Sequence, residues 1–137
     1  MALRIDRGGD RIYNSQTYQI RTPDGMMYIN LLEDKDGSLV MIDVQIGKAG
    51  GSLRVWAHCM GRMLTMLLEH GAYIDDLVEE LSSQTTDRLA IHQGNVKVRS
   101  GPEGIYVALM KYKLDKYERL KKELHVTNEF RGSIRHA

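Results

Sequence analysis

One stretch, residues 42–63, constrains the fold more than any other. Apolar residues alternate with polar ones from Ile42 to Ile46, which is the two-residue period of a β-strand. Glycines then cluster within residues 47–51, where they permit backbone angles that a Cβ would resist. A long amphipathic pattern follows from Ser52, which stands where a helix N-cap is expected. The stretch therefore predicts a buried strand, a glycine-rich turn and a helix.

The predicted helix, residues 52–70, has an apolar side and a polar side. Its large apolar residues recur at helical spacing, so we expect that side to face the core. These residues are Val55, Trp56, Cys59, Met60, Met63, Leu64 and Leu67. The single cysteine is therefore expected to be a small buried hydrophobe rather than a nucleophile. The polar side carries Arg54, His58, Arg62, Thr65 and Glu69.

A glycine-rich turn that leads into a helix is a candidate anion site. Unpaired N–H groups and the positive end of the helix dipole meet there. The turn matches neither a P-loop nor the Gly-x-Gly-x-x-Gly fingerprint, and most turns of this kind only redirect the chain. Both explanations stay open. The candidate ligand-binding residues are Gly47, Lys48, Gly50, Gly51, Ser52, Arg54, His58 and Arg62, with Arg99 or Arg131 lent by a neighbouring subunit.

The chain before this stretch predicts an antiparallel meander. Residues 1–16 are polar without a clear period, so we expect a flexible arm. Pro23 and Gly25 favour one tight turn, and Gly37 favours a second. Strands are expected over residues 18–22, 26–32 and 39–46. One face of this sheet can be wet while the other takes the helix of residues 52–70.

The chain after it predicts two more helices. A short one is expected over residues 74–83, where Asp75 and Asp76 compensate the helix dipole. Residues 84–95 are interpreted as a crossing loop, and residues 92–99 as an edge strand that pairs with the meander or with another subunit.

The last helix is expected over residues 105–124. Its apolar stripe is Tyr106, Met110, Leu114, Tyr117, Leu120 and Leu124. So small a body offers such a helix little apolar surface, so we expect a homo-oligomer. The end of the chain is expected to be frayed; the alternative is that Phe130 stacks on a base while Arg131 and Arg135 hold phosphates.

Together these elements predict the α+β class, with an antiparallel meander packed by helices and a long C-terminal amphipathic helix. Three segments form one compact domain: the arm of residues 1–16, a central unit of residues 17–86, and residues 87–137 with the last helix and a basic tail. A length of 137 residues suits a single domain.

Composition and spacing argue against several classes of function. No apolar run could cross a membrane and the N-terminus has no apolar signal core, so we expect a cytoplasmic protein. The net charge of +1 is unevenly spread, with the basic excess in residues 97–137. A solvated helix face is the commoner explanation of such an excess, so nucleic acid is an unlikely partner. The five histidines and one cysteine show no metal-ligand spacing and no catalytic grouping. We therefore expect no metal, no cofactor and no catalysis.

Three segments carry a family resemblance: residues 18–26, 42–62 and 67–81. They are similar to the TSCPD domain, which forms the C-terminal module of many adenosylcobalamin-dependent ribonucleotide reductases and also occurs as short free-standing proteins. The similarity covers about residues 17–86. Its most specific part is Ile46-Gly-Lys-Ala-Gly-Gly51, followed by Gly61-Arg62.

The departures from the family limit what the resemblance implies. The family usually has a cysteine after the double glycine and a cysteine-proline element after the second helix, suspected of binding metal. Here Ser52 and residues 82–87 stand in those places. The resemblance therefore implies a fold and a connection with nucleotides, without the thiol chemistry and without the reductase barrel.

Two functional hypotheses follow. The first is a non-catalytic protein that binds a nucleotide or another phosphate-bearing small ligand, in the manner of phage-encoded proteins that sequester nucleotide immune signals. The second is an accessory subunit that docks on a ribonucleotide reductase, or on another enzyme of nucleotide metabolism, through residues 105–124. An enzyme would need a histidine and a carboxylate brought together by the fold.

Overall fold

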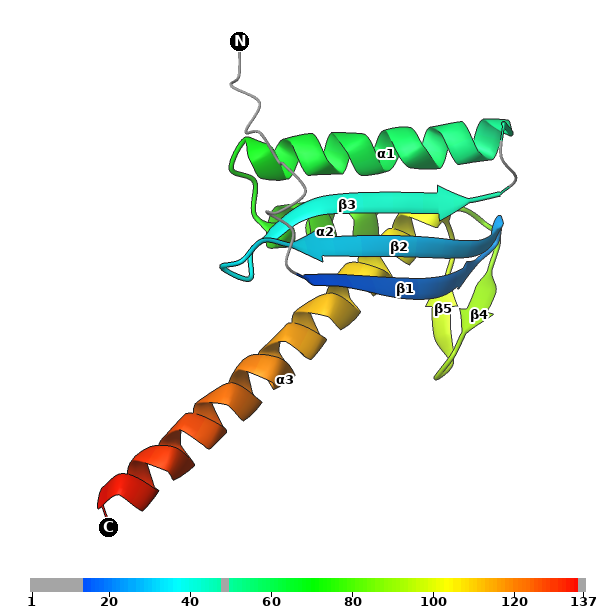
Figure 1. Ribbon diagram of the computed structural model, residues 1–137. Helices are drawn as coiled ribbons and strands as arrows, with labels where there is room; N and C mark the ends of the chain where they lie inside the picture. The colour runs from blue at the N-terminus through cyan, green and yellow to red at the C-terminus, as the bar shows by residue number, and fades with distance from the viewer. Residues whose placement is uncertain (1–13, 48–49, 136–137) are drawn as a thin grey trace.

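The computed structural model describes residues 14–47 and 50–135, with side chains as far as residue 127. It has the expected α+β class (Figure 1). The strands are β1 (Asn14–Thr22), β2 (Gly25–Glu33), β3 (Leu39–Ile46), β4 (Ala90–His92) and β5 (Val96–Val98). The helices are α1 (Ser52–Glu69), α2 (Ile74–Ser82) and α3 (Gly101–Arg135).

Strands β1, β2 and β3 form the predicted antiparallel meander, in that spatial order. Thr22 pairs with Gly25 across the first turn, where Gly25 has a φ of +119°. In the second turn the Asp34 carboxylate accepts hydrogen bonds from the backbone N–H groups of Asp36 and Ser38. Strand β1 begins at Asn14, earlier than expected, because its pairing with β2 continues to Glu33.

Alternation along the strands gives the sheet one apolar and one open face. Ile20, Met27, Ile29 and Leu31 are almost fully buried on the apolar face. The intervening residues are half-buried or exposed, as shown by Tyr28 at 44% exposure. This is the half-wet sheet that period-two patterning predicts.

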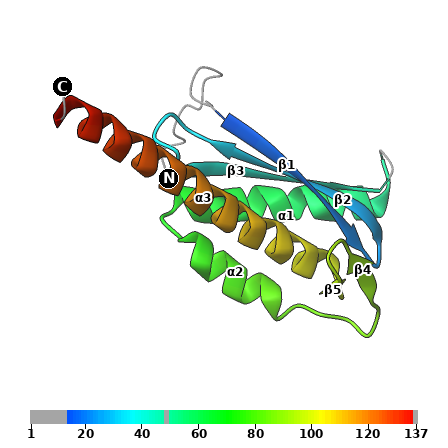
Figure 2. The same ribbon diagram turned by 90° about the horizontal axis from the view of Figure 1, so that it is seen from below.

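Helix α3 covers the apolar face, a position that the sequence interpretation gave to the helix of residues 52–70. Its first turns lie on β1 and β2, with Ile105, Leu109 and Tyr112 buried there (Figure 2). Two hydrogen bonds fix the start: the Ser100 hydroxyl accepts from the Glu103 N–H as an N-cap, and the Glu103 carboxylate accepts from the N–H of Arg99, the residue before the cap.

One expectation for α3 was wrong. Its backbone stays helical to Arg135, so the tail expected to be frayed belongs to the helix. Most of the predicted apolar stripe is exposed in the single chain, and the C-terminal half of α3 projects away from the body (Figure 1). The exposed members are Met110, Leu114, Tyr117, Leu120 and Leu124.

A buried polar cluster anchors α3 where it leaves the sheet. Glu33 at the end of β2 is 2% exposed and accepts hydrogen bonds from the Tyr112 hydroxyl, from both terminal nitrogens of Arg119 at 3.2 Å, and from Asn14. Burial by itself raises the pKa of Glu33, but the hydrogen bonds from Arg119 and Tyr112 outweigh it and hold that pKa below its usual range. Glu33 is therefore an ionised anchor inside the fold.

Helix α1 lies along the free edge of β3 instead of on the sheet face (Figure 1). The Thr65 hydroxyl accepts from the Ile42 N–H at 3.0 Å, so it satisfies a backbone donor that an edge strand would leave open. Its one proton has two carbonyl acceptors in reach, Gly61 at 2.8 Å and Ile42 at 3.1 Å. A Cβ on Gly61 would lie 2.9 Å from the Ile42 carbonyl oxygen. Only a small residue permits this approach.

The close approach of α1 to the backbone of β3 decides which side of the helix faces inward. Its buried residues are Ala57, Gly61, Leu64 and Thr65. The expected core stripe was therefore wrong, because apart from Leu64 and the half-buried Met60 its large residues point outward, Cys59 among them. Trp56 is 73% exposed and Met63 61% exposed.

Helix α2 packs on α3 through Leu77 and Leu81 (Figure 2). The segment interpreted as a loop and a single edge strand is instead the hairpin β4–β5, a separate two-stranded sheet. His92 is buried there, and its Nδ1 accepts from the backbone N–H of Arg21 at 3.2 Å. Burial, with the neighbouring Lys111 and Arg21, lowers the pKa of His92, which makes it a neutral structural histidine.

Candidate functional site

A groove lies between α1 and the open face of the meander. It has a volume of about 370 Å³, which is within the range of small-molecule sites. The strands contribute the floor and α1 contributes one wall. The lining residues are Ser15, Asn30, Leu32, Met41, Ile42, Asp43, His58, Arg62 and Thr65.

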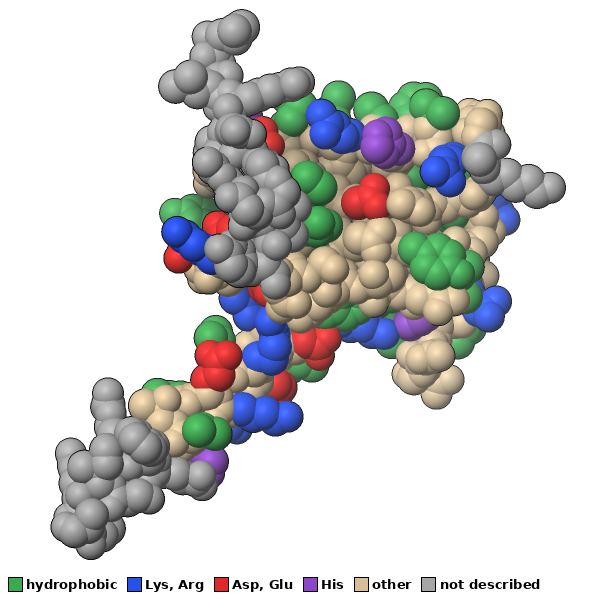
Figure 3. Space-filling model, viewed as in Figure 1, with side chains coloured by type: hydrophobic (Ala, Val, Ile, Leu, Met, Phe, Trp, Pro, Cys, Tyr) green, Lys and Arg blue, Asp and Glu red, His purple; other side chains and the backbone are tan. Residues whose placement is uncertain are grey.

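The α1 wall of the groove belongs to a row of two arginines and a histidine. Arg54, His58 and Arg62 recur every four residues and therefore stack along one side of the helix. All three are exposed, and within the described part of the chain none has a hydrogen bond or ion pair to another side chain. Figure 3 shows basic side chains and a histidine in a row above the sheet.

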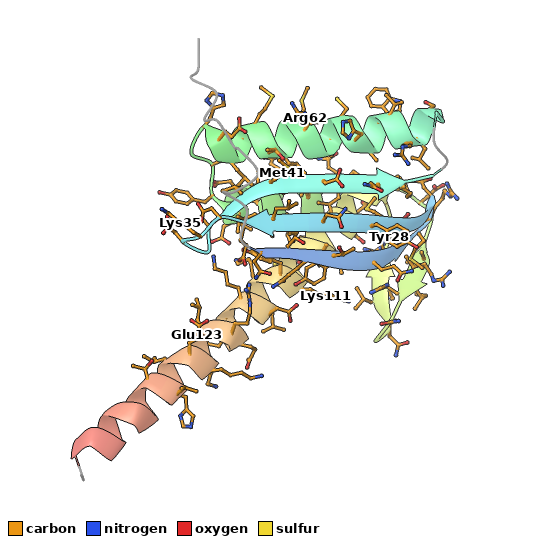
Figure 4. All side chains as sticks on the ribbon, in the orientation of Figure 1. Tyr28, Lys35, Met41, Arg62, Lys111 and Glu123 are labelled. Atoms are coloured by element: carbon orange, nitrogen blue, oxygen red, sulfur yellow. The ribbon has the colours of Figure 1, made fainter. Side chains whose placement is uncertain are left out.

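The floor of the groove combines polar and apolar groups from neighbouring strands. Asn30 on β2 donates to Asp43 on β3 at 2.8 Å, and Gln45 donates to the same carboxylate oxygen at 3.0 Å. Leu32 and Met41 form an apolar section beside them. In Figure 4, Arg62 on α1 and Met41 on β3 mark the two sides of this region. Acceptors, amides and an apolar surface thus face a cationic helix.

The glycine-rich turn stands at the end of this arrangement, outside the groove. Gly47 and Gly50 have φ values of +79° and +81°, so the turn does need glycine. The N-cap is Gly51 and no side chain caps the helix, so Ser52 is the first helical residue and the expectation that it caps was wrong. Because a helix rises 1.5 Å per residue, the start of α1 and Arg62 are about 15 Å apart. One phosphate cannot contact both.

Arg99, expected to be lent by a neighbouring subunit, does not line the groove of its own chain. Arg99 lies between β5 and α3, where its backbone takes part in the α3 cap and in a hydrogen bond with Thr86. Lys48 and the side chain of Arg131 lie outside the described residues. The structure therefore joins His58 and Arg62 in one groove, with Arg54 one turn away on the same side of α1.

Sequence reasoning missed the strand side of the groove. Asn30, Leu32, Met41 and Asp43 lie on the open face, and the period-two pattern of β2 and β3 could have indicated this. What the pattern could not supply was their position beside Arg62, because that depends on α1 lying at the sheet edge.

Three further observations concern metal, membrane and histidine–carboxylate sites in the described residues. No group of three or more histidine, cysteine, aspartate or glutamate side chains among them could hold a metal ion. Within the same ranges, no helix combines the length and apolar character needed to cross a membrane. His58 and Asp43 line the same groove, but no hydrogen bond joins them in the described structure.

The fold and the groove define a small α+β domain with a basic helix beside an open sheet face. The chain belongs to the TSCPD domain family, whose family model matches residues 10–113. This confirms the resemblance and relates the chain to modules of ribonucleotide reductases. The match extends through β4, β5 and the first part of α3, further than the sequence segments indicated. Comparisons with curated proteins and with solved structures gave no match.

Proposed function

We propose that this chain is a non-catalytic protein that binds a nucleotide, or another small phosphate-bearing ligand, in the groove between α1 and the open sheet face. The observation that carries the proposal is the meeting of His58 and Arg62 with the polar and apolar floor of a groove of about 370 Å³. The family connection with ribonucleotide reductase modules supports a ligand of the nucleotide class.

Each part of a nucleotide has a matching surface in this groove. Side chains one turn apart on a helix are about 5–6 Å apart, so a phosphate between His58 and Arg62 can contact both. Arg54 is then placed for a second phosphate. Leu32 and Met41 offer an apolar surface to a base, while Asn30 and Asp43 offer a donor and an acceptor to a ribose. The Asp43 carboxylate would repel a phosphate on the floor, which favours a ligand orientation with its phosphates on α1.

The test is titration calorimetry of the purified chain with a panel of nucleoside mono-, di- and triphosphates and cyclic dinucleotides. We expect saturable binding for one class, and Arg62→Ala should weaken it about tenfold or more because a charge-assisted contact is lost. Lys97→Ala is the matched control, since this exposed residue of β5 removes the same charge outside the groove. No binding by any member of the panel, or equal weakening by both variants, would contradict the proposal.

Sequestration, as opposed to turnover, has its own readout. After incubation, the protein is denatured and the released nucleotide is identified by chromatography. A sequestering protein returns the nucleotide unchanged at a fixed ratio to chain. Conversion into a new compound would replace the binding proposal with an enzymatic one, in which His58 and Asp43 are the first residues to examine.

A second candidate function rests on α3. Leu114, Tyr117 and Leu124 are each 60–63% exposed on α3, which makes a surface suited to docking on another protein. An accessory role beside a ribonucleotide reductase would use this surface. Leu120→Glu and Leu124→Glu should then abolish capture of purified reductase by the immobilised chain, while Arg62→Ala should leave capture unchanged.

A further inference from the structure

The side of α1 that faces away from the sheet carries a continuous apolar surface. We call it the outer ridge and define it as Val55, Trp56, Cys59, Met63, Met66 and Leu67. Trp56 is 73%, Val55 62% and Met63 61% exposed, and Met66 and Leu67 are about half exposed. Figure 3 shows hydrophobic side chains along the edge of the molecule formed by α1.

The outer ridge joins five large side chains that are about half exposed or more, which makes it comparable with the largest apolar patch of an ordinary monomer, about 300–600 Å² and often functional. Two patches of that size in contact would bury up to about 1,200 Å², the lower end of the range for specific interfaces. A contact between two ridges therefore has the area that a small dimer interface needs.

The chemistry of the ridge fits a second copy of the same chain. In a two-fold interface, residues near the axis meet their own counterparts, so a charged patch would repel itself. The ridge holds no Lys, Arg, Asp or Glu; Arg62 lies on its border. By contrast, the exposed stripe of α3 contains a charge, because Lys121 lies one turn from both Tyr117 and Leu124. Self-association thus favours α1.

The surface next to the outer ridge also has a groove that a partner's side chain can fill. An apolar groove of about 180 Å³ runs between α1 and the beginning of α3. Leu53, Trp56 and Met60 line it from α1, and Pro102 and Ile105 line it from α3. A flat ridge beside a groove allows a side chain of one copy to insert into the other, which is how interface hot spots are built.

We propose that the outer ridge of α1 is the contact through which two copies of this chain form a two-fold dimer. This inference does not depend on ligand binding, since no residue of the outer ridge lines the candidate groove. The interface leaves the groove beside Arg62 open to solvent in each copy.

Sedimentation velocity over a concentration series tests the proposal. We expect the wild-type chain to be a dimer, and Trp56→Glu and Met63→Glu to raise the dimer dissociation constant at least about tenfold by placing a charge in the contact. Leu120→Glu is the matched control, because Leu120 is 54% exposed on α3. Far-ultraviolet circular dichroism checks that each variant is folded. A monomeric wild type, or a dimer that survives both ridge variants, would overturn the proposal.

The single tryptophan and the single cysteine report on the same contact. Dimerisation should shift the Trp56 emission to shorter wavelength and slow the reaction of the Cys59 thiol with a disulfide reagent as the protein concentration rises. Met63→Glu should abolish both changes. If the wild-type chain dimerises while its Trp56 emission and Cys59 reactivity stay constant, the interface lies elsewhere and the proposal is contradicted.

Discussion

Helices α1 and α3 each present apolar residues to the sheet and to solvent, but they meet the sheet in different ways. Helix α1 touches the backbone of the edge strand through Gly61 and Thr65, whereas α3 lies on side chains of the apolar face, with Gly104 against Thr22 and Met27. In both helices, large apolar residues remain outside. The comparison teaches that a helix sealing a strand edge must present small residues, which releases its large ones for other contacts.

The largest expected effect concerns the anchor of α3. Glu33→Ala leaves the Tyr112 hydroxyl and the Arg119 guanidinium without their shared acceptor. We expect a loss of about 3 kcal/mol in the free energy of unfolding, somewhat reduced because Arg119 can reach water. Urea unfolding followed by circular dichroism measures it. A loss below about 1 kcal/mol would show that packing alone holds α3.

The next prediction compares the two glycines directly. An added Cβ at Gly61 meets the Ile42 carbonyl oxygen at 2.9 Å, and backbone cannot move aside easily. At Gly104 it meets the Thr22 methyl group at 2.9 Å. Alanine favours a helix more than glycine does, and this gain offsets part of the clash. The net loss in the free energy of unfolding should be about 2 kcal/mol for Gly61→Ala and about 1 kcal/mol for Gly104→Ala. The same unfolding measurement serves both, and the reverse order would break the comparison between edge and face.

Acid should weaken the α3 anchor by a smaller amount. Because the pKa of Glu33 is lowered in the folded protein, its contribution is complete above the unfolded value of about 4.3 and is lost as pH falls through the folded value. The stability that ionised Glu33 provides should therefore be lost below about pH 4.3. The stability linked to neutral His92, whose pKa is also lowered in the folded protein, is lost from about pH 6.5 downward. Urea midpoints of Glu33→Gln should lack the lower phase; its persistence would contradict the assignment.

The smallest expected effect is on the projecting part of α3. Leu120 is 54% exposed, so Leu120→Glu should change the free energy of unfolding by less than about 0.5 kcal/mol. Leu109→Ala, at a fully buried position of the same helix, should cost about 3 kcal/mol. Thermal and urea unfolding of the pair test this. Similar losses in both variants would mean that the projecting part is packed against something in solution.

Much of the fold was predictable because its signals are local. The turns at Gly25 and Gly37, the alternation of the strands and the starts of α1 and α2 all follow from short-range patterns. The orientation of α1 was not predictable from the sequence. Periodicity locates an apolar stripe but does not say whether that stripe meets the core or another molecule. Only the distance between Gly61 and β3 decides that.

The candidate site was predictable on one side only. Spacing along α1 identified Arg54, His58 and Arg62 as one row, and the structure confirms that they share a side of the helix. Asn30 and Asp43 were not predicted, because only the tertiary structure places them beside that row. The Glu33–Arg119 pair escaped for the same reason, since the two residues are far apart in the sequence and neither carries a local signal.

The central claim is that α1 serves three contacts: the strand edge, a ligand and a second copy. Native mass spectrometry with added nucleotides tests it most directly. The account predicts a dimer that retains one nucleotide-sized mass per chain, Arg62→Ala as a bare dimer, and Met63→Glu as a monomer that still binds. A wild-type chain that is monomeric and bare with every nucleotide tested would contradict it.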